Sequence, residues 1–267
     1  MNFIEKLARA SHKNKSLLCV GLDTDPALVP ETTSVFEFNK AIIDATSDLV
    51  CAYKPNIAFY EAMGTTGLEA LKKTRDYIPE EIPVIIDAKR GDIGNTAKAY
   101  AKSLFEHYNF DAMTASPYLG LDSLEPFINY HDRGIFILCR TSNPGAADFQ
   151  SLSIQMEGGP KMLFEIVAEK VNSWNTHGNL GLVVGATYPR ELKLIRERYP
   201  EIPLLIPGVG TQGGELSETV KFGVDARHEK TIITSSRQIL YASRGKDFAV
   251  AARKAAEDIK NKINSYL

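Results

Sequence analysis

Eight short apolar runs, separated by longer segments with helical periodicity, constrain the fold of this chain more than any other feature. The runs are Leu17–Leu22, Ala52–Phe59, Val84–Ile86, Ala112–Ala115, Ile135–Cys139, Leu180–Val184, Leu204–Ile206 and Ile232–Thr234. Short apolar runs of this kind predict buried strands. Strands that alternate with helices indicate βαβ units and therefore a parallel sheet.

The segments between these runs place apolar residues at helical spacing. Clear examples are Phe36–Leu49, Gly67–Tyr77, Thr96–Tyr108, Met162–Trp174, Glu191–Tyr199 and Phe248–Ile263. Eight strands with intervening helices in about 250 residues fit a closed (β/α)8 barrel, the TIM barrel, better than an open sheet. No linker, low-complexity tract or change of composition divides the 267 residues, so we predict a single domain over residues 1–267.

The third apolar run ends abruptly in charged residues, within the segment Pro83–Asp92. On a regular strand, Asp87 and Lys89 would project to the same side, with Ala88 turned away. Asp92 follows at the predicted start of a helix. A lysine held between two carboxylates stays protonated, so we predict that Lys89 acts as a general acid. The alternative is an ordinary surface ion pair, and the surrounding residues have to decide between the two.

Polar residues also follow the other predicted strands. Asp23 comes after the first run, Lys54 and Asn56 lie on the second, and Ser142 follows the fifth. The carboxyl ends of all strands meet at one face of a barrel, where barrel enzymes place their active sites. Chance is a poor explanation for so many polar residues at one face, and we therefore predict an active site there.

The last two strands carry the signal of an anion site. The segment Gly208–Gly214 leaves the seventh strand and enters a helix, and its glycines permit close approach to the backbone. Loops after the last two strands of such barrels often bind phosphate. Arg237 follows the eighth strand and offers a planar two-pronged donor. We predict a phosphorylated small substrate.

Composition excludes several other classes of protein. The net charge of −2 gives no electrostatic reason to expect nucleic acid or an anionic membrane as a partner. The three cysteines, Cys19, Cys51 and Cys139, lie in apolar runs and are predicted to be buried thiols of a reducing compartment. The N-terminal residues do not form a secretory signal, and no window approaches the about 20 apolar residues of a membrane span. We therefore expect a cytoplasmic protein.

Other site signatures are weak. The segment starting at Gly208 lacks the third glycine and the acidic residue of a dinucleotide-binding fingerprint, and no Walker sequence occurs. The five histidines are scattered outside the strand ends, so we expect no metal site. The longest irregular stretch, Asn143–Pro160, is either a functional loop or a tolerated surface insertion.

Together these residues resemble the orotidine 5′-phosphate decarboxylase family, in its branch of longer chains. The resemblance covers essentially the whole chain and is most specific at Asp87–Thr96. Its motifs are Val20–Asp23, Lys54–Asn56, Asp87–Thr96, Thr141–Gly145, Pro207–Gly214 and Arg237. The residues before Arg237 are Ser235 and Ser236, where many members of the family have glycine directly before the arginine.

The resemblance implies loss of CO2 from C6 of orotidine 5′-monophosphate to give UMP, in de novo pyrimidine synthesis, without metal or organic cofactor. Lys89 would protonate the C6 carbanion, and Asp87 would face the departing carboxylate. Lys54 would link Asp87 and Asp23 in a charged network that reaches the ribose hydroxyls. The family's homodimer implies that Asp92 enters the active site of the neighbouring subunit.

The resemblance also implies roles in binding. Asn56 would contact the ribose, and Ser142 would read the pyrimidine edge. The phosphate-binding set would be Gln212, Gly213, Ser236 and Arg237. Ile93 and Thr96 would contact the substrate, with Thr96 entering the neighbouring subunit's site together with Asp92.

Two alternatives remain at this stage. The first is a Mg²⁺-dependent sugar-phosphate decarboxylase or aldolase of the same barrel superfamily, which shares the Asp-x-Lys-x-x-Asp pattern. Lys54 argues against it, because a cation beside Asp23 and Asp87 takes the electrostatic role of that metal. The second is a catalytically silent barrel that only binds a nucleotide, which the complete set of charged residues disfavours.

Overall fold

The computed structural model describes residues 1–31, 33–209 and 215–267. Eight of its strands form one sheet in the order β2-β1-β10-β9-β8-β5-β4-β3. These strands are β1 (Leu18–Gly21), β2 (Ala52–Lys54), β3 (Ile85–Arg90), β4 (Ala112–Ala115), β5 (Gly134–Arg140), β8 (Leu180–Val184), β9 (Leu204–Ile206) and β10 (Thr231–Ser235). All neighbouring pairs are parallel, and parallel bridges from Tyr53 to Val84 and from Asn56 to Asp87 join the two ends of the sheet. The predicted TIM barrel is confirmed.

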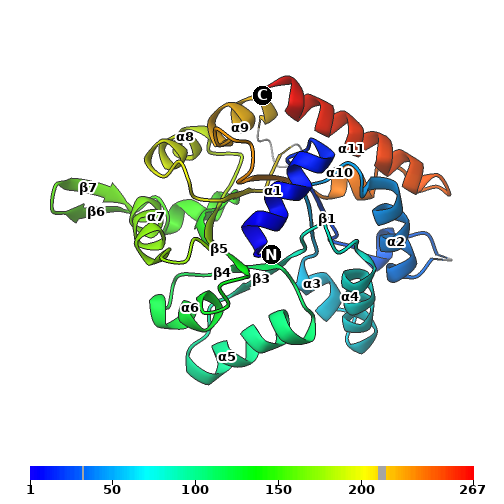
Figure 1. Cartoon of the computed structure of the whole chain (residues 1–267), viewed down its shortest axis with the longest axis horizontal. Coiled ribbons are helices and arrows are strands. Elements are labelled where there is room, and N and C mark those ends of the chain that lie inside the picture. The colour runs from blue at the N-terminus through cyan, green and yellow to red at the C-terminus, as the bar shows by residue number, and fades with distance from the viewer. Residues whose placement is uncertain (32, 210–214) are drawn as a thin grey trace.

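Helices surround the strands, as Figure 1 shows. They are α1 (Phe3–Asn14), α2 (Val35–Thr46), α3 (Ile57–Glu61), α4 (Thr65–Tyr77), α5 (Gly94–Lys102), α6 (Leu121–Ile128), α7 (Leu163–Trp174), α8 (Pro189–Arg198), α9 (Leu216–Gly223), α10 (Arg237–Leu240) and α11 (Phe248–Ser265). The 3-10 helices η1 (Pro26–Leu28) and η3 (Pro144–Asp148) and the π-helical η2 (Ser103–His107) complete the set. Within the described ranges, no helix has the length and apolar character needed to cross a membrane.

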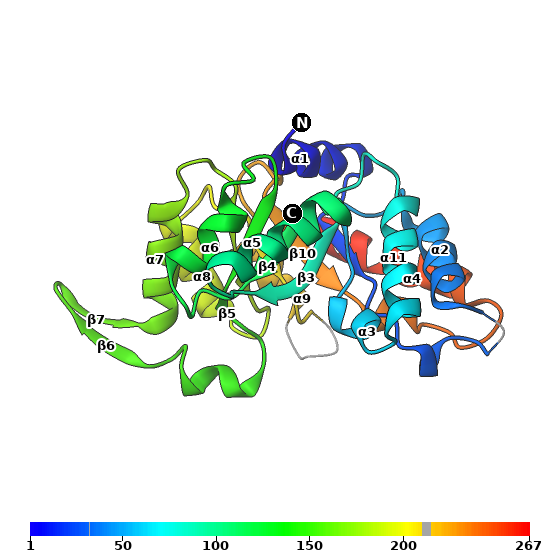
Figure 2. The same cartoon turned by 90° about the horizontal axis from the view of Figure 1, so that it is seen from below.

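The core has two layers. The larger one packs the outward side chains of the strands against the surrounding helices, for example Phe38 of α2 and Leu71 of α4. The smaller one fills the barrel with inward side chains such as Ile85, Phe136 and Ile232, and α1 contributes Phe3 to it. Burial of this apolar surface is the main force that holds the layers together. Helix α1 lies across the amino-terminal end of the barrel and covers its interior (Figures 1 and 2).

The structure corrects two predictions. The second apolar run does not continue as a strand to Phe59, because β2 ends at Lys54 and the side chain of Asn56 caps α3 by accepting a hydrogen bond from the Ala58 N–H at 3.1 Å. The segment 143–160 is not irregular. It contains η3 and most of an antiparallel hairpin formed by β6 (Ser153–Met156) and β7 (Gly159–Met162), which projects from the side of the barrel in Figure 2.

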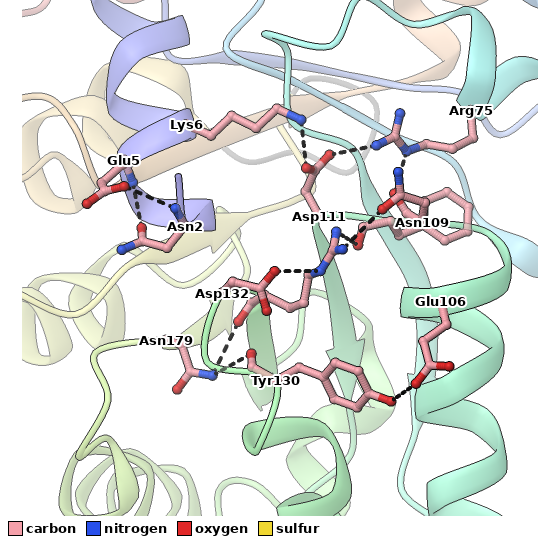
Figure 3. Close-up of polar contacts among 12 residues, drawn as sticks. Asn2, Glu5, Lys6, Arg75, Glu106, Asn109, Asp111, Tyr130, Asp132 and Asn179 are labelled. Atoms are coloured by element: carbon pink, nitrogen blue, oxygen red, sulfur yellow. Dashed lines mark hydrogen bonds and ion pairs between the residues drawn. The ribbon is translucent and has the colours of Figure 1, made fainter.

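A buried ion cluster anchors α1 beneath the barrel. Asp111, just before β4, lies between Lys6 of α1 and Arg75 of α4 (Figure 3). Lys6 Nζ donates to Asp111 Oδ1 at 2.6 Å, and Arg75 Nη2 lies 3.4 Å from Asp111 Oδ2. The Val84 N–H donates to the same Oδ2 at 2.9 Å. One carboxylate therefore connects a covering helix, an outer helix and the entrance to β3.

Replacement of Asp111 by alanine should destabilise the protein strongly. Lys6, Asp111 and Arg75 have side chains only 8%, 11% and 8% exposed, so the change leaves two buried cations without their carboxylate. We expect the free energy of unfolding, measured by urea denaturation, to fall by about 3–5 kcal/mol. The control is Asp76→Ala, whose ion pair with Lys72 is exposed and should contribute under about 0.5 kcal/mol. Equal losses in the two variants would contradict this role.

Candidate active site

A cavity of about 530 Å³ opens at the carboxyl end of the barrel strands. Most of the predicted site residues line it, and they come from five strand ends or the loops that follow them. These residues are Asp23, Lys54, Asn56, Asp87, Lys89, Ser142, Ser236 and Arg237. Parallel strands in a closed barrel bring their carboxyl ends together, and this is the physical reason for the convergence that the sequence predicted.

A chain of alternating charges crosses the cavity floor. Lys54 Nζ lies 3.1 Å from Asp87 Oδ2 and 3.9 Å from Asp23 Oδ1. Lys89 Nζ donates to the other oxygen of Asp87, Oδ1, at 2.6 Å. Lys54 is only 5% exposed, whereas half of the Lys89 side chain is exposed, so Lys89 is the lysine that a ligand can reach.

Burial and charge act in opposite directions on the pKa values of this network. Burial alone would raise the pKa of Asp87, but the ammonium groups of Lys54 and Lys89 hold that pKa well below its usual value. Burial alone would lower the pKa of Lys54, but Asp23 and Asp87 raise it above its usual value. Asp87 is therefore a carboxylate and Lys54 an ammonium at neutral pH.

The backbone at Lys89 differs from the predicted regular strand. Lys89 has φ +49°, in the left-handed region, and the pairing of β3 with β4 shifts register between Ile86 and Arg90. The side chains of Asp87 and Lys89 do meet, but an irregular backbone brings them together rather than simple alternation along a strand. Non-glycine residues seldom adopt this conformation, and such residues cluster at functional sites.

Asp92 does not contact Lys89 in the described part of the chain. Its Oδ1 accepts a hydrogen bond from the Ile93 N–H at 2.8 Å instead. The prediction of a lysine between two carboxylates is therefore wrong within a single chain, because Asp87 is the only carboxylate among the described residues that pairs with Lys89. Asp92, Ile93 and Thr96 are exposed and lie outside the cavity lining. The turn that carries them away needs glycine, because a Cβ on Gly91 would lie 2.6 Å from the Ser116 carbonyl oxygen.

The structure describes only part of the predicted phosphate-binding site. Gln212 and Gly213 lie outside the described residues. Gly208 has φ +95°, and Pro207, Gly208 and Val209 line the cavity after β9. Arg237 is exposed at the start of α10. Beside it the Ser236 hydroxyl packs over Gly21, where a Cβ would lie 1.9 Å from Ser236 Oγ.

Sequence reasoning missed several polar residues of the cavity, among them Thr114 and Gln150. Thr114 is the penultimate residue of β4 and bonds to the segment of β3 that carries Asp87 and Lys89, and its position near a strand end was a usable signal. Gln150 lies in the segment that we predicted to be irregular. Its Oε1 accepts a hydrogen bond from the Thr141 N–H at 2.8 Å and so supports the strand end before Ser142. No sequence signal marks Gln150, because its role depends on the path of the loop.

The family comparison decides how this geometry is interpreted. The model of the "Orotidine 5′-phosphate decarboxylase / HUMPS family" matches residues 16–255. This chain belongs to that family. It is 54% identical over 266 residues to the orotidine 5′-phosphate decarboxylase of Dehalococcoides mccartyi (strain CBDB1), covering 100% of this chain and 98% of the relative. The orotidine 5′-phosphate decarboxylase of Cupriavidus necator is 50% identical over 275 residues, which cover 100% of this chain and 99% of the relative.

Solved structures agree with the family assignment. The Leishmania donovani OMP decarboxylase superposes with a TM-score of 0.87 at 41% identity, covering 100% of this chain and 99% of that one. The Leishmania donovani UMP synthase gives a TM-score of 0.88 at 42% identity, with 100% of this chain but 56% of that chain covered. The resemblance found in the sequence is thus confirmed at the level of the orotidine 5′-phosphate decarboxylase family.

Proposed function

We propose that this chain decarboxylates orotidine 5′-monophosphate to UMP and CO2, with Lys89 as the proton donor to C6. Family membership and full-length relatives of the same name support the reaction. The observation that carries the residue assignment is the contact between the reachable Lys89 ammonium and the Asp87 carboxylate, whose side chain is only 13% exposed. This pair places a cation and an anion side by side on the floor of the cavity.

The proposed mechanism uses each charge at a different stage. Asp87 faces the substrate carboxylate, and binding energy from the distant phosphate holds the two anions together. The bond between C6 and the carboxylate carbon breaks, CO2 leaves and the electron pair stays on C6. The fixed ammonium of Lys89 stabilises this carbanion and then gives it a proton, leaving a neutral amine that solvent reprotonates.

The remaining cavity residues receive binding roles in this proposal. Asp23 and Asn56 contact the ribose hydroxyls, and Ser142 reads the pyrimidine edge. Ser236 and Arg237 hold the phosphate together with Gln212 and Gly213. Arg237 suits this role because its guanidinium can make two parallel bonds to phosphate oxygens.

The Mg²⁺-dependent alternative has no support. Lys54 Nζ occupies the space between the carboxylates of Asp23 and Asp87, at 3.9 and 3.1 Å, and supplies the positive charge that a metal would bring. We therefore propose a reaction that needs no metal or organic cofactor. We also propose that the enzyme is cytoplasmic.

We further propose a homodimer in which Asp92, Ile93 and Thr96 complete the partner's site. The exposure of all three residues in one chain supports this arrangement. Exposed apolar side chains lie on the two adjacent loops, with Ile93 56%, Tyr118 81% and Leu119 48% exposed. The Ser116 N–H donates to the Arg90 carbonyl at 2.6 Å, which holds these loops side by side. Large apolar side chains exposed together favour association.

Wild-type protein should convert orotidine 5′-monophosphate to UMP at the same rate with and without EDTA. Lys89→Ala should lower kcat on the order of 10⁴-fold, because both acid catalysis and carbanion stabilisation are lost. The control is Lys254→Ala, an exposed lysine of α11, which should keep wild-type activity. The loss of substrate is followed by absorbance. Inactivation by EDTA would favour the metal-dependent alternative, and a fully active Lys89→Ala protein would refute the proton donor.

Mixing two inactive variants tests the shared site. Lys89→Ala and Asp92→Ala homodimers should each be crippled, because every site lacks one charged group. In a mixed dimer one active site contains both substitutions and the other contains neither. Random reassortment makes half of the dimers mixed, so activity should recover to about a quarter of wild type. If native mass spectrometry finds mixed dimers and activity does not recover, Asp92 serves its own chain.

A further inference from the structure

Thr114 makes three hydrogen bonds to the segment that carries the two central charges. It is the penultimate residue of β4, is 2% exposed and lines the cavity. Its Oγ1 accepts from the Ala88 N–H at 3.1 Å and from the Lys89 N–H at 3.0 Å. The same hydroxyl donates to Asp87 Oδ1 at 2.8 Å. The side chain therefore bonds both to the carboxylate and to the backbone beyond it.

The direction of the bond to Asp87 follows from the other two. A hydroxyl has two lone pairs and one proton. The two backbone N–H groups occupy the lone pairs of Thr114, so its proton must point at the carboxylate. A valine in the same space would leave both N–H groups facing a methyl group. A serine would keep all three bonds.

These bonds support two features that the proposed reaction needs. The first is the left-handed backbone of Lys89, with φ +49°, which costs free energy unless its surroundings hold it. The second is the orientation of the Asp87 carboxylate. Its Oδ1 accepts hydrogen bonds from Thr114 and Lys89, whereas its Oδ2 accepts one from Lys54. Thr114 is thus the neutral partner that completes the set of donors around Asp87.

We infer that Thr114 is a positioning residue of this site: its hydroxyl fixes the Lys89 backbone and the Asp87 carboxylate in the geometry that decarboxylation requires. Thr114 does not transfer a proton and does not need to touch the substrate. Its contribution is to keep Lys89 Nζ in line with C6. This inference rests on the proposed function, because it concerns the same reaction.

The matched pair Thr114→Ser and Thr114→Ala tests the inference. Both variants lose the γ-methyl group, and they differ only in the hydroxyl. We expect Thr114→Ala to lower kcat about 10- to 100-fold, the effect of a misplacement on the order of 1 Å. Thr114→Ser should retain most of the wild-type kcat. The affinity for UMP, measured by calorimetry, should stay within a factor of about two in both, since the hydroxyl acts on the reacting groups and not on ligand binding.

Each other outcome has a defined meaning. Equal kcat values for the two variants would overturn the inference, because the hydroxyl would then be irrelevant. A parallel fall of UMP affinity and kcat in Thr114→Ala would also overturn it, since that pattern marks a general disruption of the cavity. If Thr114→Ala does not fold, the isosteric Thr114→Val is compared with the wild-type protein instead, because valine and threonine differ only in the exchange of the hydroxyl for a methyl group. An inactive wild-type protein would refute the proposed function itself, whatever the variants do.

Discussion

The site depends on one interaction, the pairing of the Asp87 carboxylate with two ammonium groups. A buried carboxylate without a cation would lose its charge or destabilise the fold. Lys54 and Lys89 hold the two oxygens of Asp87 at 3.1 and 2.6 Å and keep its pKa low. Burial alone would lower the pKa of Lys54, and Asp23 acts together with Asp87 to raise it above its usual value. The four charges therefore stabilise one another.

Closure of the barrel is what assembles this set. Asp23 follows β1, Lys54 ends β2 and Asp87 lies on β3, so the network spans three adjacent strands. The register of β1 with β2 and the bridge between Asn56 and Asp87 bring these side chains to one level. At the opposite end, Asp111 ties α1 to the barrel. Two charged clusters thus occupy the two ends, and only the one at the carboxyl end is open to a ligand.

The strands and the central charges could be predicted from the sequence, because both depend on local patterns. A buried apolar run identifies a strand, and a charge at its end identifies the open face of the barrel. The cap formed by Asn56, the left-handed backbone of Lys89 and the hairpin β6–β7 were not predicted. The cap and the hairpin rest on local contacts, from Asn56 to Ala58 and between β6 and β7, which the apolar pattern does not report. The Lys89 backbone depends on a distant segment, because Thr114 of β4 bonds to it.

The same distinction applies to Asp92. Its pattern with Asp87 and Lys89 is local, and it indicated a lysine between two carboxylates. The turn at Gly91 takes Asp92 out of the cavity instead. No sequence periodicity predicts this displacement, because the displacement follows from the packing of Gly91 against Ser116. In the proposed dimer, this exposed position would place Asp92 at the partner's site.

The ionisation of Asp87 is the most direct measure of the central claim. Carboxyl-labelled aspartate can be followed by ¹³C NMR while the pH is lowered, and the Asp87→Asn spectrum identifies the Asp87 signal. Because Lys54 and Lys89 lower its pKa, Asp87 should remain ionised after exposed aspartates have titrated near their usual pKa of about 3.9. The stability that Asp87 contributes should be present at neutral pH and lost only as the pH falls through that low pKa. A midpoint at or above about 4 for Asp87 would contradict the account.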